Sequence, residues 1–199
     1  MLTHKGTQTI ETNRLILRKV RKKDAEPMFR NWTSDPQVTK YLTWPTHESI
    51  AVTEMVIESW LREYEKENYY QWMIELKELE EPIGSISVVR QNEQVEEAEI
   101  GYCIGSRWWH QGIMSEALSA VMKYLFTEVC MNRISARHDP NNPHSGGVMR
   151  KCGMIYEGTT HASDHNNQGI CDAMHYAILR THCLSLWESL DDEAVIERE

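Results

Sequence analysis

This sequence has little positive charge, no long hydrophobic run and no cysteine motif. It contains 21 Lys and Arg against 30 Asp and Glu, which gives a formal net charge of −9 at pH 7. Phosphate contacts need clustered Lys and Arg, so this balance argues against a general nucleic-acid-binding protein and leaves cationic amines open as substrates. No apolar run approaches the length of a membrane span, and the amino terminus lacks a hydrophobic signal core. We therefore expect a cytoplasmic protein with no nucleic-acid or membrane partner.

The five cysteines do not form a Cys-x-x-Cys pair. Their number is odd and most of them fall inside apolar patterns, so we expect reduced, buried thiols rather than disulfides. His, Cys and carboxylate residues do not cluster with the spacing of metal ligands, and we expect no metal. The cysteines are Cys103, Cys130, Cys152, Cys171 and Cys183.

The length of 199 residues and the apolar content of 41% suit one well-packed domain. We find no repeat, linker or low-complexity block, and expect a single domain over 1–199 with its core at about 12–180. An acidic tail follows over 184–199. Its apolar residues allow a homodimer, and a monomer is equally open; they are Leu184, Leu186, Trp187 and Leu190.

The chain is organised around a predicted strand at 98–104, a turn, and a predicted helix that starts at Ser115. The strand is apolar and branched, and the helix has an apolar stripe at three- and four-residue spacing. Gly112 in the turn allows another group to approach the backbone closely. This stripe contains Leu118, Val121, Met122, Leu125, Phe126 and Val129.

This strand, turn and helix start suit an anion such as pyrophosphate. The first amides of a helix lack internal partners, and the helix dipole leaves partial positive charge there. A purely structural turn is the alternative. The two common phosphate motifs do not fit, because no Gly-Lys-Ser/Thr follows Gly112, and Gly101 and Gly105 are spaced wrongly for a dinucleotide fingerprint.

The remaining elements predict an α+β fold of seven strands and about four helices. Residues 1–13 are polar and are expected to have little structure. Asp24 is expected to cap a short helix, and Thr46 a longer one over 47–67 whose buried stripe is Val52, Met55, Val56, Trp60 and Tyr64. The last helix covers 144–152 and ends at Gly153. The other strands are expected at 14–20, 69–76, 83–90, 133–137, 154–161 and 171–180, the last two joined by a turn at 164–169.

The stretch from Trp109 to Ala117 resembles the acetyl-coenzyme A loop of the GNAT N-acetyltransferase superfamily. It is most similar to the ribosomal-protein-alanine N-acetyltransferase branch, whose loop reads Trp-Gly-Lys-Gly-Tyr-Ala-Thr-Glu-Ala. His110 replaces a usual glycine, and Met114 a usual alanine or glycine. Further matches follow in order, namely Asn142 and Ser145, a helix that ends in Lys-x-Gly, and a last hairpin.

The resemblance implies the GNAT fold, with a mixed, mostly antiparallel seven-stranded sheet. Its fourth and fifth strands, 98–104 and 133–137, are expected to splay apart and admit acetyl-CoA. The aromatic residues expected to contact the acceptor are Trp32, Tyr41, Trp44 and Trp60. The residues expected to bind acetyl-CoA are Cys103, Ile104, Trp109, His110, Gln111, Gly112, Ile113, Met114, Ser115, Asn142, Ser145 and Lys151.

Acetyl transfer to an amine needs a base, because an alkylammonium has a pKa near ~10 and is charged at pH 7. The resemblance implies Glu99 or else Asp164 for this role, with His161 and His165 near the latter. Glu99 could equally be a solvated strand-edge charge. The resemblance also implies that Ser145 donates a proton to the leaving thiolate. The alternative role for this serine is to cap a helix.

Two further site features depend on particular backbone and side-chain groups. The backbone amides near Cys103 and Ile104 are the expected oxyanion donors. Asn142 faces the pantetheine arm in the family, although capping of a helix is its common structural role. A covalent route through Cys103 or Cys152 lacks a Cys/His signature.

We therefore expect an acetyl-CoA-dependent N-acetyltransferase that moves the acetyl group directly to a primary amine. The acceptor is either a protein N-terminus or a small-molecule amine. The alternative is a non-catalytic acyl-CoA-binding or sensing module of the same fold, and a nucleotide-binding protein is a third, weaker candidate.

Overall fold

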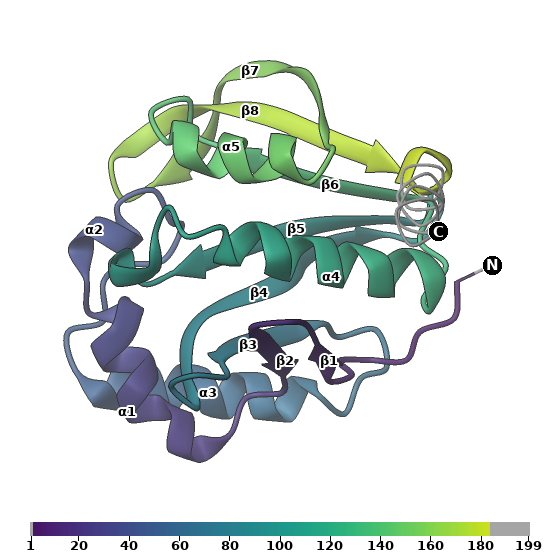
Figure 1. Cartoon of the computed structure of the whole chain (residues 1–199). Helices are drawn as coiled ribbons and strands as arrows, with labels where there is room; N and C mark the ends of the chain where they lie inside the picture. The colour runs from purple at the N-terminus through teal and green to yellow at the C-terminus, as the bar shows by residue number, and fades with distance from the viewer. Residues whose placement is uncertain (1, 184–199) are drawn as a thin grey trace, which may run out of the picture.

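The computed structural model describes residues 2–183, and its strands form one mixed eight-stranded sheet (Figure 1). The strand order is β1-β2-β3-β4-β5-β6-β8-β7, and within it only β5 and β6 pair in parallel. This confirms the expected α+β fold with a mostly antiparallel sheet. The strands are β1 (Ile10–Glu11), β2 (Leu15–Arg18), β3 (Gln71–Leu76), β4 (Glu81–Asn92), β5 (Glu97–Ile104), β6 (Arg133–His138), β7 (Ile155–Asn166) and β8 (Gly169–Leu179).

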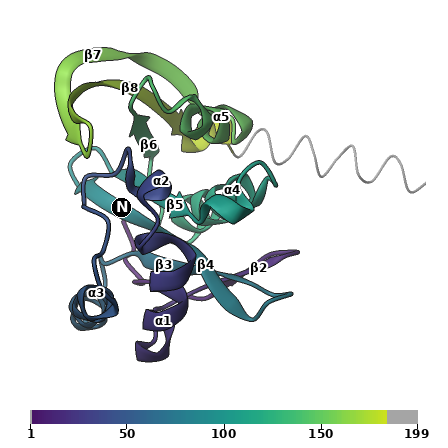
Figure 2. The ribbon, with the colours of Figure 1, turned by 90° about the vertical axis from the view of Figure 1, so that its left-hand side faces the viewer.

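Helices cover both faces of this sheet, with α3 and α4 on opposite sides (Figures 1 and 2). Side chains alternate along β5, so Ala98, Ile100 and Ile104 join the larger core under α4. Cys103 packs instead against the smaller core near α1 and α3. The helices are α1 (Ala25–Met28), α2 (Pro36–Thr39), α3 (Ile50–Glu63), α4 (Ile113–Thr127) and α5 (Pro143–Lys151), with short turns of 3-10 or π helix at Lys22–Asp24, Phe29–Thr33 and Ser106–Trp108.

The predicted apolar stripe of α4 is confirmed. All six of its residues are at most 1% exposed. Burial of each such side chain contributes roughly 1.5–3 kcal/mol, so this stripe anchors the helix to the sheet. The helix begins at Ile113, two residues before the expected start, because Gly112 adopts a left-handed φ of 71° at the N-cap.

The expected splay between two central strands is also confirmed. β5 and β6 pair only over Glu97–Glu99 and Arg133–Ser135. β5 continues to Ile104 and β6 to His138, and these halves are not paired with each other. The sheet therefore opens where β5 leads into the loop before α4.

The sheet has one more strand than the seven predicted. β1 pairs with β2 through Ile10↔Leu17 and Glu11↔Ile16, within the stretch expected to lack structure. A hydrogen bond from the Leu15 N–H to Thr12 Oγ1 (3.0 Å) closes the turn between the two strands. Two residues are too few to show an alternating pattern, so tertiary pairing forms this strand.

Asp24 occupies the N-cap position of α1, as predicted, but its side chain makes no capping hydrogen bond to that helix. It is 2% exposed, and its carboxylate accepts two hydrogen bonds from Arg18, at 2.7 and 2.9 Å. Arg18 also donates to Glu75 at 2.5 Å. Asp24 therefore neutralises a buried arginine across the sheet. The expected short helix is instead divided into α1 and a π turn, and Asp35 caps a further short helix, α2.

The boundaries of α3 are narrower than the predicted 47–67. Ser49, not Thr46, occupies the N-cap. The Thr46 hydroxyl instead hydrogen bonds to the Thr39 hydroxyl at 2.6 Å. Thr46 therefore fixes the loop before the helix.

The predicted buried stripe of α3 is wrong at Met55, which is 64% exposed. Thr53 and Ile57 are buried in its place. A polar residue is tolerated at this buried position because the Thr53 hydroxyl hydrogen bonds to Thr33 (3.2 Å) and His47 (2.8 Å). The spacing of the apolar residues alone therefore misplaces part of the buried face, because a threonine occupies one of the buried positions.

The last hairpin is longer than predicted. β7 and β8 remain paired to Asn166↔Gly169, so most of the expected turn at 164–169 belongs to the strands. Two register shifts in β7 disrupt the alternation that marks a strand. Gly153 ends α5 with a φ of 81°, as expected. The predicted tail over 184–199 and its apolar residues lie outside the described residues.

Candidate active site

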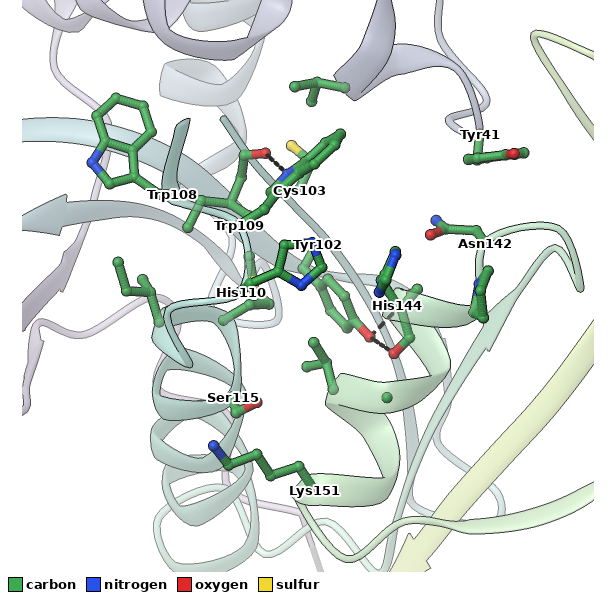
Figure 3. Close-up of a pocket in the computed structure, with 18 of the residues that line it drawn as sticks. Tyr41, Tyr102, Cys103, Trp108, Trp109, His110, Ser115, Asn142, His144 and Lys151 are labelled. Atoms are coloured by element: carbon green, nitrogen blue, oxygen red, sulfur yellow. Dashed lines mark hydrogen bonds between the residues drawn. The ribbon is translucent and has the colours of Figure 1, made fainter. Parts of the chain in front are cut away.

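A cavity of about 920 Å³ lies where the end of β5, the start of α4 and α5 meet (Figure 3). Of the residues assigned to acetyl-CoA, only Gln111 does not line it. The Gln111 carbonyl accepts a hydrogen bond from Arg14 at 2.9 Å, and its side chain donates to the Arg107 carbonyl at 3.0 Å. The assigned residues that line it are Cys103, Ile104, Trp109, His110, Gly112, Ile113, Met114, Ser115, Asn142, Ser145 and Lys151.

Two cationic side chains reach Gly112 at the start of α4, and one of them, Arg14, also pairs with Glu116 at 2.6 Å. A Cβ built on this glycine would lie 3.5 Å from Lys151 Nζ and 3.8 Å from Arg14 Nη2. The amides of the first helical turn have no partner within the helix, and the helix dipole adds partial positive charge. Open backbone, unpaired amides and two cations together provide the chemistry that binds a pyrophosphate.

His110 and Asn142 lie on the wall of the same cavity. His110 has a φ of 60°, which is strained for a residue other than glycine, and its ring meets the His144 ring edge-to-face at 4.6 Å (Figure 3). The Asn142 side chain does not cap α5. Its amide is therefore available to a ligand in the cavity.

The backbone of β5 presents the Ile104 amide at the opening. The Gly105 N–H donates to Ile83 O on β4 at 2.9 Å, and backbone groups alternate sides along an antiparallel strand. Ile104 therefore directs its N–H and C=O away from β4, and its carbonyl accepts from Trp109 Nε1 at 2.9 Å on that side. Of the two expected oxyanion donors, the geometry favours Ile104 over Cys103.

A second cavity, of about 430 Å³, lies on the α3 side of β5. The four aromatic residues assigned to the acceptor all line it, although Trp32 is fully buried in the wall. The two cavities meet, because they share lining residues from the α2 loop, from β5 and from the start of α5. The shared residues are Tyr41, Leu42, Tyr102, Cys103, Asn142 and Ser145.

Arg137 joins the two carboxylates that the sequence nominates as bases. Glu99 is buried, and its two oxygens accept from Arg90 and Arg137. Arg137 also donates to Asp164 at 2.6 Å. Burial acts to raise the pKa of Asp164, but hydrogen bonds from Arg137 and from the His165 amide outweigh it and hold the pKa below its ordinary value. Asp164 is therefore ionised at neutral pH.

The two histidines near Asp164 lie in different places. His165 lines the second cavity. His161 is 84% exposed at its side chain and pairs with Asp172 at 2.9 Å, outside both cavities.

A third carboxylate, Asp139, also lines the second cavity. It is 8% exposed and accepts hydrogen bonds from Asn166 Nδ2 (2.8 Å) and the Asn141 N–H (2.7 Å). Burial acts to raise the pKa of Asp139, but these amide donors outweigh it and lower the pKa. Its negative charge is therefore held by amide donors, with a further contribution from the Cys171 thiol.

Ser145 and Tyr102 form a pair of hydroxyl groups where the cavities meet (Figure 3). Ser145 Oγ donates to the Tyr102 hydroxyl at 3.1 Å, and that hydroxyl donates to the Ser145 carbonyl at 2.9 Å. Burial raises the pKa of Tyr102, so its hydroxyl keeps its proton. Ser145 therefore does not cap the helix, and Tyr102 is part of the site.

The five cysteines are all free, but only Cys183 is buried and the other four are half-buried, so the expected burial is wrong for four of them. Burial raises the pKa of Cys103 and of Cys152. A thiol needs a lowered pKa to act as a nucleophile at neutral pH. The local environment therefore disfavours a covalent route through either cysteine.

Gly146 allows α5 to lie directly on the buried His138. A Cβ at Gly146 would lie 2.4 Å from His138 Nε2. The imidazole is held by a hydrogen bond between Nδ1 and the Asp139 carbonyl at 2.8 Å and by its contact with the Tyr176 ring. The close approach sets the position of Ser145 and Asn142 at the start of this helix.

We expect Gly146→Ala to lower the free energy of unfolding by about 1–3 kcal/mol, because the added methyl group overlaps a side chain that cannot move away. Gly147→Ala is the matched control. A Cβ there would meet only Arg150 Nη2, at 4.0 Å, so the better helix propensity of alanine should stabilise the protein by up to about 1 kcal/mol. Urea denaturation measures both values. Equal effects of the two substitutions would contradict this description of α5.

Several residues of the site were missed in the sequence. Arg14 and Arg137 lie far in the chain from the motifs they serve, so no local pattern marks them. Tyr102 belongs to no motif, although its position one residue before Cys103 on the splayed strand is a usable signal.

Among residues 2–183, no group of three or more His, Cys, Asp or Glu side chains is arranged to hold a metal ion. None of the helices in this part of the chain has the length and hydrophobicity that a membrane crossing requires.

Comparison with known proteins identifies relatives over most of the chain. Residues 14–155, more than half of it, match the acetyltransferase (GNAT) domain. The "Uncharacterized N-acetyltransferase YoaA" of Bacillus subtilis is 32% identical over 171 residues, which cover 86% of this chain and 96% of that protein. The "[Ribosomal protein uS5]-alanine N-acetyltransferase" of Escherichia coli is 37% identical over 59 residues, 30% of each chain.

Solved structures of acetyltransferases have the same fold as this chain. The acetyltransferase (GNAT family) from Bacillus anthracis superposes with a TM-score of 0.76 at 28% identity, covering 87% of this chain and 99% of that one. The microcin C7 self-immunity acetyltransferase MccE, solved in complex with acetyl-CoA and AMP, shares the fold at 21% identity with a TM-score of 0.76, covering 89% of this chain and 98% of that one. The chain therefore belongs to the GNAT family and is an acyltransferase with ribosomal-protein alanine N-acetyltransferases among its homologues.

Proposed function

We propose that this protein transfers an acetyl group directly from acetyl-CoA to a primary amine. The observation that carries the proposal is the meeting of two cavities at the splayed end of β5. Acetyl-CoA enters from the α4 side and the amine from the α3 side. Both reactants are then held together, which removes most of the entropic cost of their encounter.

The larger cavity suits acetyl-CoA along its whole length. The amides from Gly112 to Ser115, with Arg14 and Lys151, hold the pyrophosphate. Asn142 faces the pantetheine arm. The cavity volume of about 920 Å³ suits a large ligand.

The Ile104 amide stabilises the oxyanion that forms on the thioester carbonyl. It faces the opening of the sheet and has no strand partner on that side. A fixed donor of this kind costs no reorganisation when charge develops, and loss of one such donor costs roughly 10²–10³ in rate.

The smaller cavity suits a cationic acceptor. Its charged lining contains Glu99, Asp139 and Asp164 against Arg137, so negative charge is in excess. Tyr41, Trp44 and Trp60 also line it. Aromatic faces attract cations, and the carboxylates add Coulombic attraction. An ammonium group is therefore stabilised electrostatically when it enters the cavity.

The hydroxyl pair of Ser145 and Tyr102 serves the leaving group. The thiolate needs one proton to leave as free coenzyme A. In the family that this chain resembles, the serine at the position of Ser145 lies near the thioester sulfur. A hydrogen bond from Ser145 Oγ to the Tyr102 hydroxyl connects the two groups. Ser145 gives its hydroxyl proton to the thiolate and takes a proton from the reacting amine in return.

The carboxylates are better suited to binding than to taking the amine proton. Glu99 accepts from two arginines, and the Asp164 oxygens accept from Arg137 and the His165 amide. We propose that Glu99 and Asp164 fix Arg137 and attract the ammonium group.

The acceptor is a protein N-terminus or a small-molecule amine. One relative is named for an alanine of ribosomal protein uS5, and the fold neighbour MccE was solved with acetyl-CoA and AMP. Both kinds of acceptor carry a primary amine, which is the group that the charge of the cavity favours. The protein acts as a monomer or a homodimer in the cytoplasm, without a metal.

A panel of an alanyl peptide, an alkyl diamine and an aromatic amine tests this function. The expected result is release of coenzyme A thiol together with acetylation of at least one amine. The rival is a non-catalytic acyl-CoA-binding module. It predicts saturable binding of acetyl-CoA without acetylation of any amine, and that result would replace our proposal.

A further inference from the structure

His47 lies in the acceptor cavity and has no role in the site described so far. It belongs to the loop before α3, is 7% exposed, and lines the cavity beside the Trp44 ring, with centroids 5.4 Å apart. Its backbone N–H donates to the Thr33 carbonyl at 2.8 Å, which fixes the loop. The side chain is therefore held at a defined place in the wall.

A chain of hydrogen bonds determines which nitrogen of His47 carries the proton. Thr33 Oγ1 donates to the Met28 carbonyl at 3.4 Å, because a carbonyl can only accept. Each hydroxyl has one proton, so Thr53 Oγ1 donates to Thr33 Oγ1 at 3.2 Å. Thr53 Oγ1 is then left to accept from His47 Nδ1 at 2.8 Å. The proton of the neutral ring lies on Nδ1.

The lone pair of His47 therefore lies on Nε2. This atom makes no hydrogen bond to a described residue, and it is not among the fully buried nitrogens. Since the residue lines the acceptor cavity, Nε2 is open to it. Burial lowers the pKa of His47, so the ring is neutral at pH 7.

Within residues 2–183, no charged group shifts the pKa of this ring. Its neighbours Trp44 and Thr53 are uncharged, and burial alone shifts its pKa. The charged and titratable groups elsewhere on the cavity wall include Glu99, Arg137, Asp139, Asp164, His138 and His165. Glu99 and Asp164 are occupied by arginine, and the His138 Nε2 atom is fully buried. His47 thus offers a free lone pair.

We propose that His47 Nε2 is the general base that removes a proton from the acceptor ammonium, directly or through one water molecule. This rests on the proposed function. The ammonium gives its first proton to Nε2, and the neutral nitrogen attacks the thioester carbonyl carbon. The C–N bond forms, the C–S bond breaks, and a second amine proton passes to the sulfur through Ser145. His47 then releases its proton to solvent, so one proton is released per acetyl group transferred.

The test variant is His47→Asn. The asparagine amide can still donate to Thr53 at the position of Nδ1, whereas the basic nitrogen is lost. His161→Asn is the matched control, because His161 is exposed and lies outside both cavities. Both variants are assayed in the full-length protein for melting temperature, acetyl-CoA affinity and turnover of the amine that the wild type acetylates fastest.

We expect His47→Asn to lower kcat by about 10²-fold or more, with acetyl-CoA affinity and melting temperature close to wild type. In wild type, kcat should fall only at pH values below the ordinary histidine pKa of about 6.5, because burial lowers the pKa of His47, and this acidic limb should be absent in His47→Asn. A weakly basic acceptor such as a hydrazide, already neutral at pH 7, should largely rescue the variant. A purely structural histidine predicts no such rescue.

Three results would overturn the proposal. One is a normal rate and an unchanged acidic limb in His47→Asn. Another is loss of the limb in Glu99→Gln while His47→Asn keeps it, which would assign the base to Glu99. The third is that wild type acetylates no amine, in which case both the proposed function and the role of His47 fail. If wild type is active and only the His47→Asn results differ from those expected, only the role of His47 is overturned.

Discussion

Gly112→Asp should weaken the binding of acetyl-CoA by about 100-fold or more, the largest change in affinity that we expect from a single substitution. The new carboxylate would occupy the surface on which Arg14 and Lys151 converge and would compete for both cations. It would also repel a pyrophosphate, and opposed like charges in an interface cost several kcal/mol. Isothermal titration calorimetry measures the effect.

Gly112→Asn separates charge from shape in this experiment. Asparagine has nearly the same size as aspartate and tolerates the left-handed backbone that Gly112 adopts, with a φ of 71°. We expect Gly112→Asn to weaken the binding of acetyl-CoA far less than Gly112→Asp does, by roughly tenfold at most, because it adds only backbone strain and bulk. Equal losses in the two variants would show that the amides before Ser115 do not hold an anion.

Arg18→Met should lower the free energy of unfolding by about 3–5 kcal/mol, because it leaves two carboxylates without their cation. Arg18 and Asp24 are 4% and 2% exposed at their side chains, and Glu75 is 12% exposed. Hydrogen bonding to Asp24 and Glu75 offsets burial and raises the pKa of Arg18. Chemical denaturation at neutral pH measures the loss.

Arg30→Met is the control for charge removal alone. Arg30 also pairs with two carboxylates, Glu26 at 2.6 Å and Glu81 at 2.7 Å, but its side chain is 47% exposed. Exposed pairs contribute about 0–1 kcal/mol, so this variant should unfold almost as wild type does. A loss for Arg18→Met as small as that for Arg30→Met would mean that water replaces the buried guanidinium.

The parts of the fold that the sequence predicted correctly have long, regular patterns. The stripe of α4 runs through the helix at constant spacing, and the strand at 98–104 is apolar on one face. The patterns failed where tertiary contacts decide the structure. β1 exists because β2 pairs with it, and Thr53 is buried because Thr33 and His47 satisfy its hydroxyl.

The candidate site divides in the same way. The loop from Trp109 to Ser115 is contiguous, so a motif reveals it. The cations beside it come from distant parts of the chain: Arg14 lies in the turn before β2 and Lys151 at the end of α5, and only folding brings them together. Arg137 is another such case, since its partners Glu99 and Asp164 belong to different strands.

The central claim is that an acetyl group passes directly from acetyl-CoA to an amine while both occupy adjoining cavities. Initial rates at varied acetyl-CoA and several fixed amine concentrations test it most directly. Direct transfer predicts double-reciprocal lines that intersect, with acetylated amine and free coenzyme A formed in equal amounts. Parallel lines, together with an acetylated enzyme after mixing with acetyl-CoA alone, would indicate a covalent intermediate and would contradict the account.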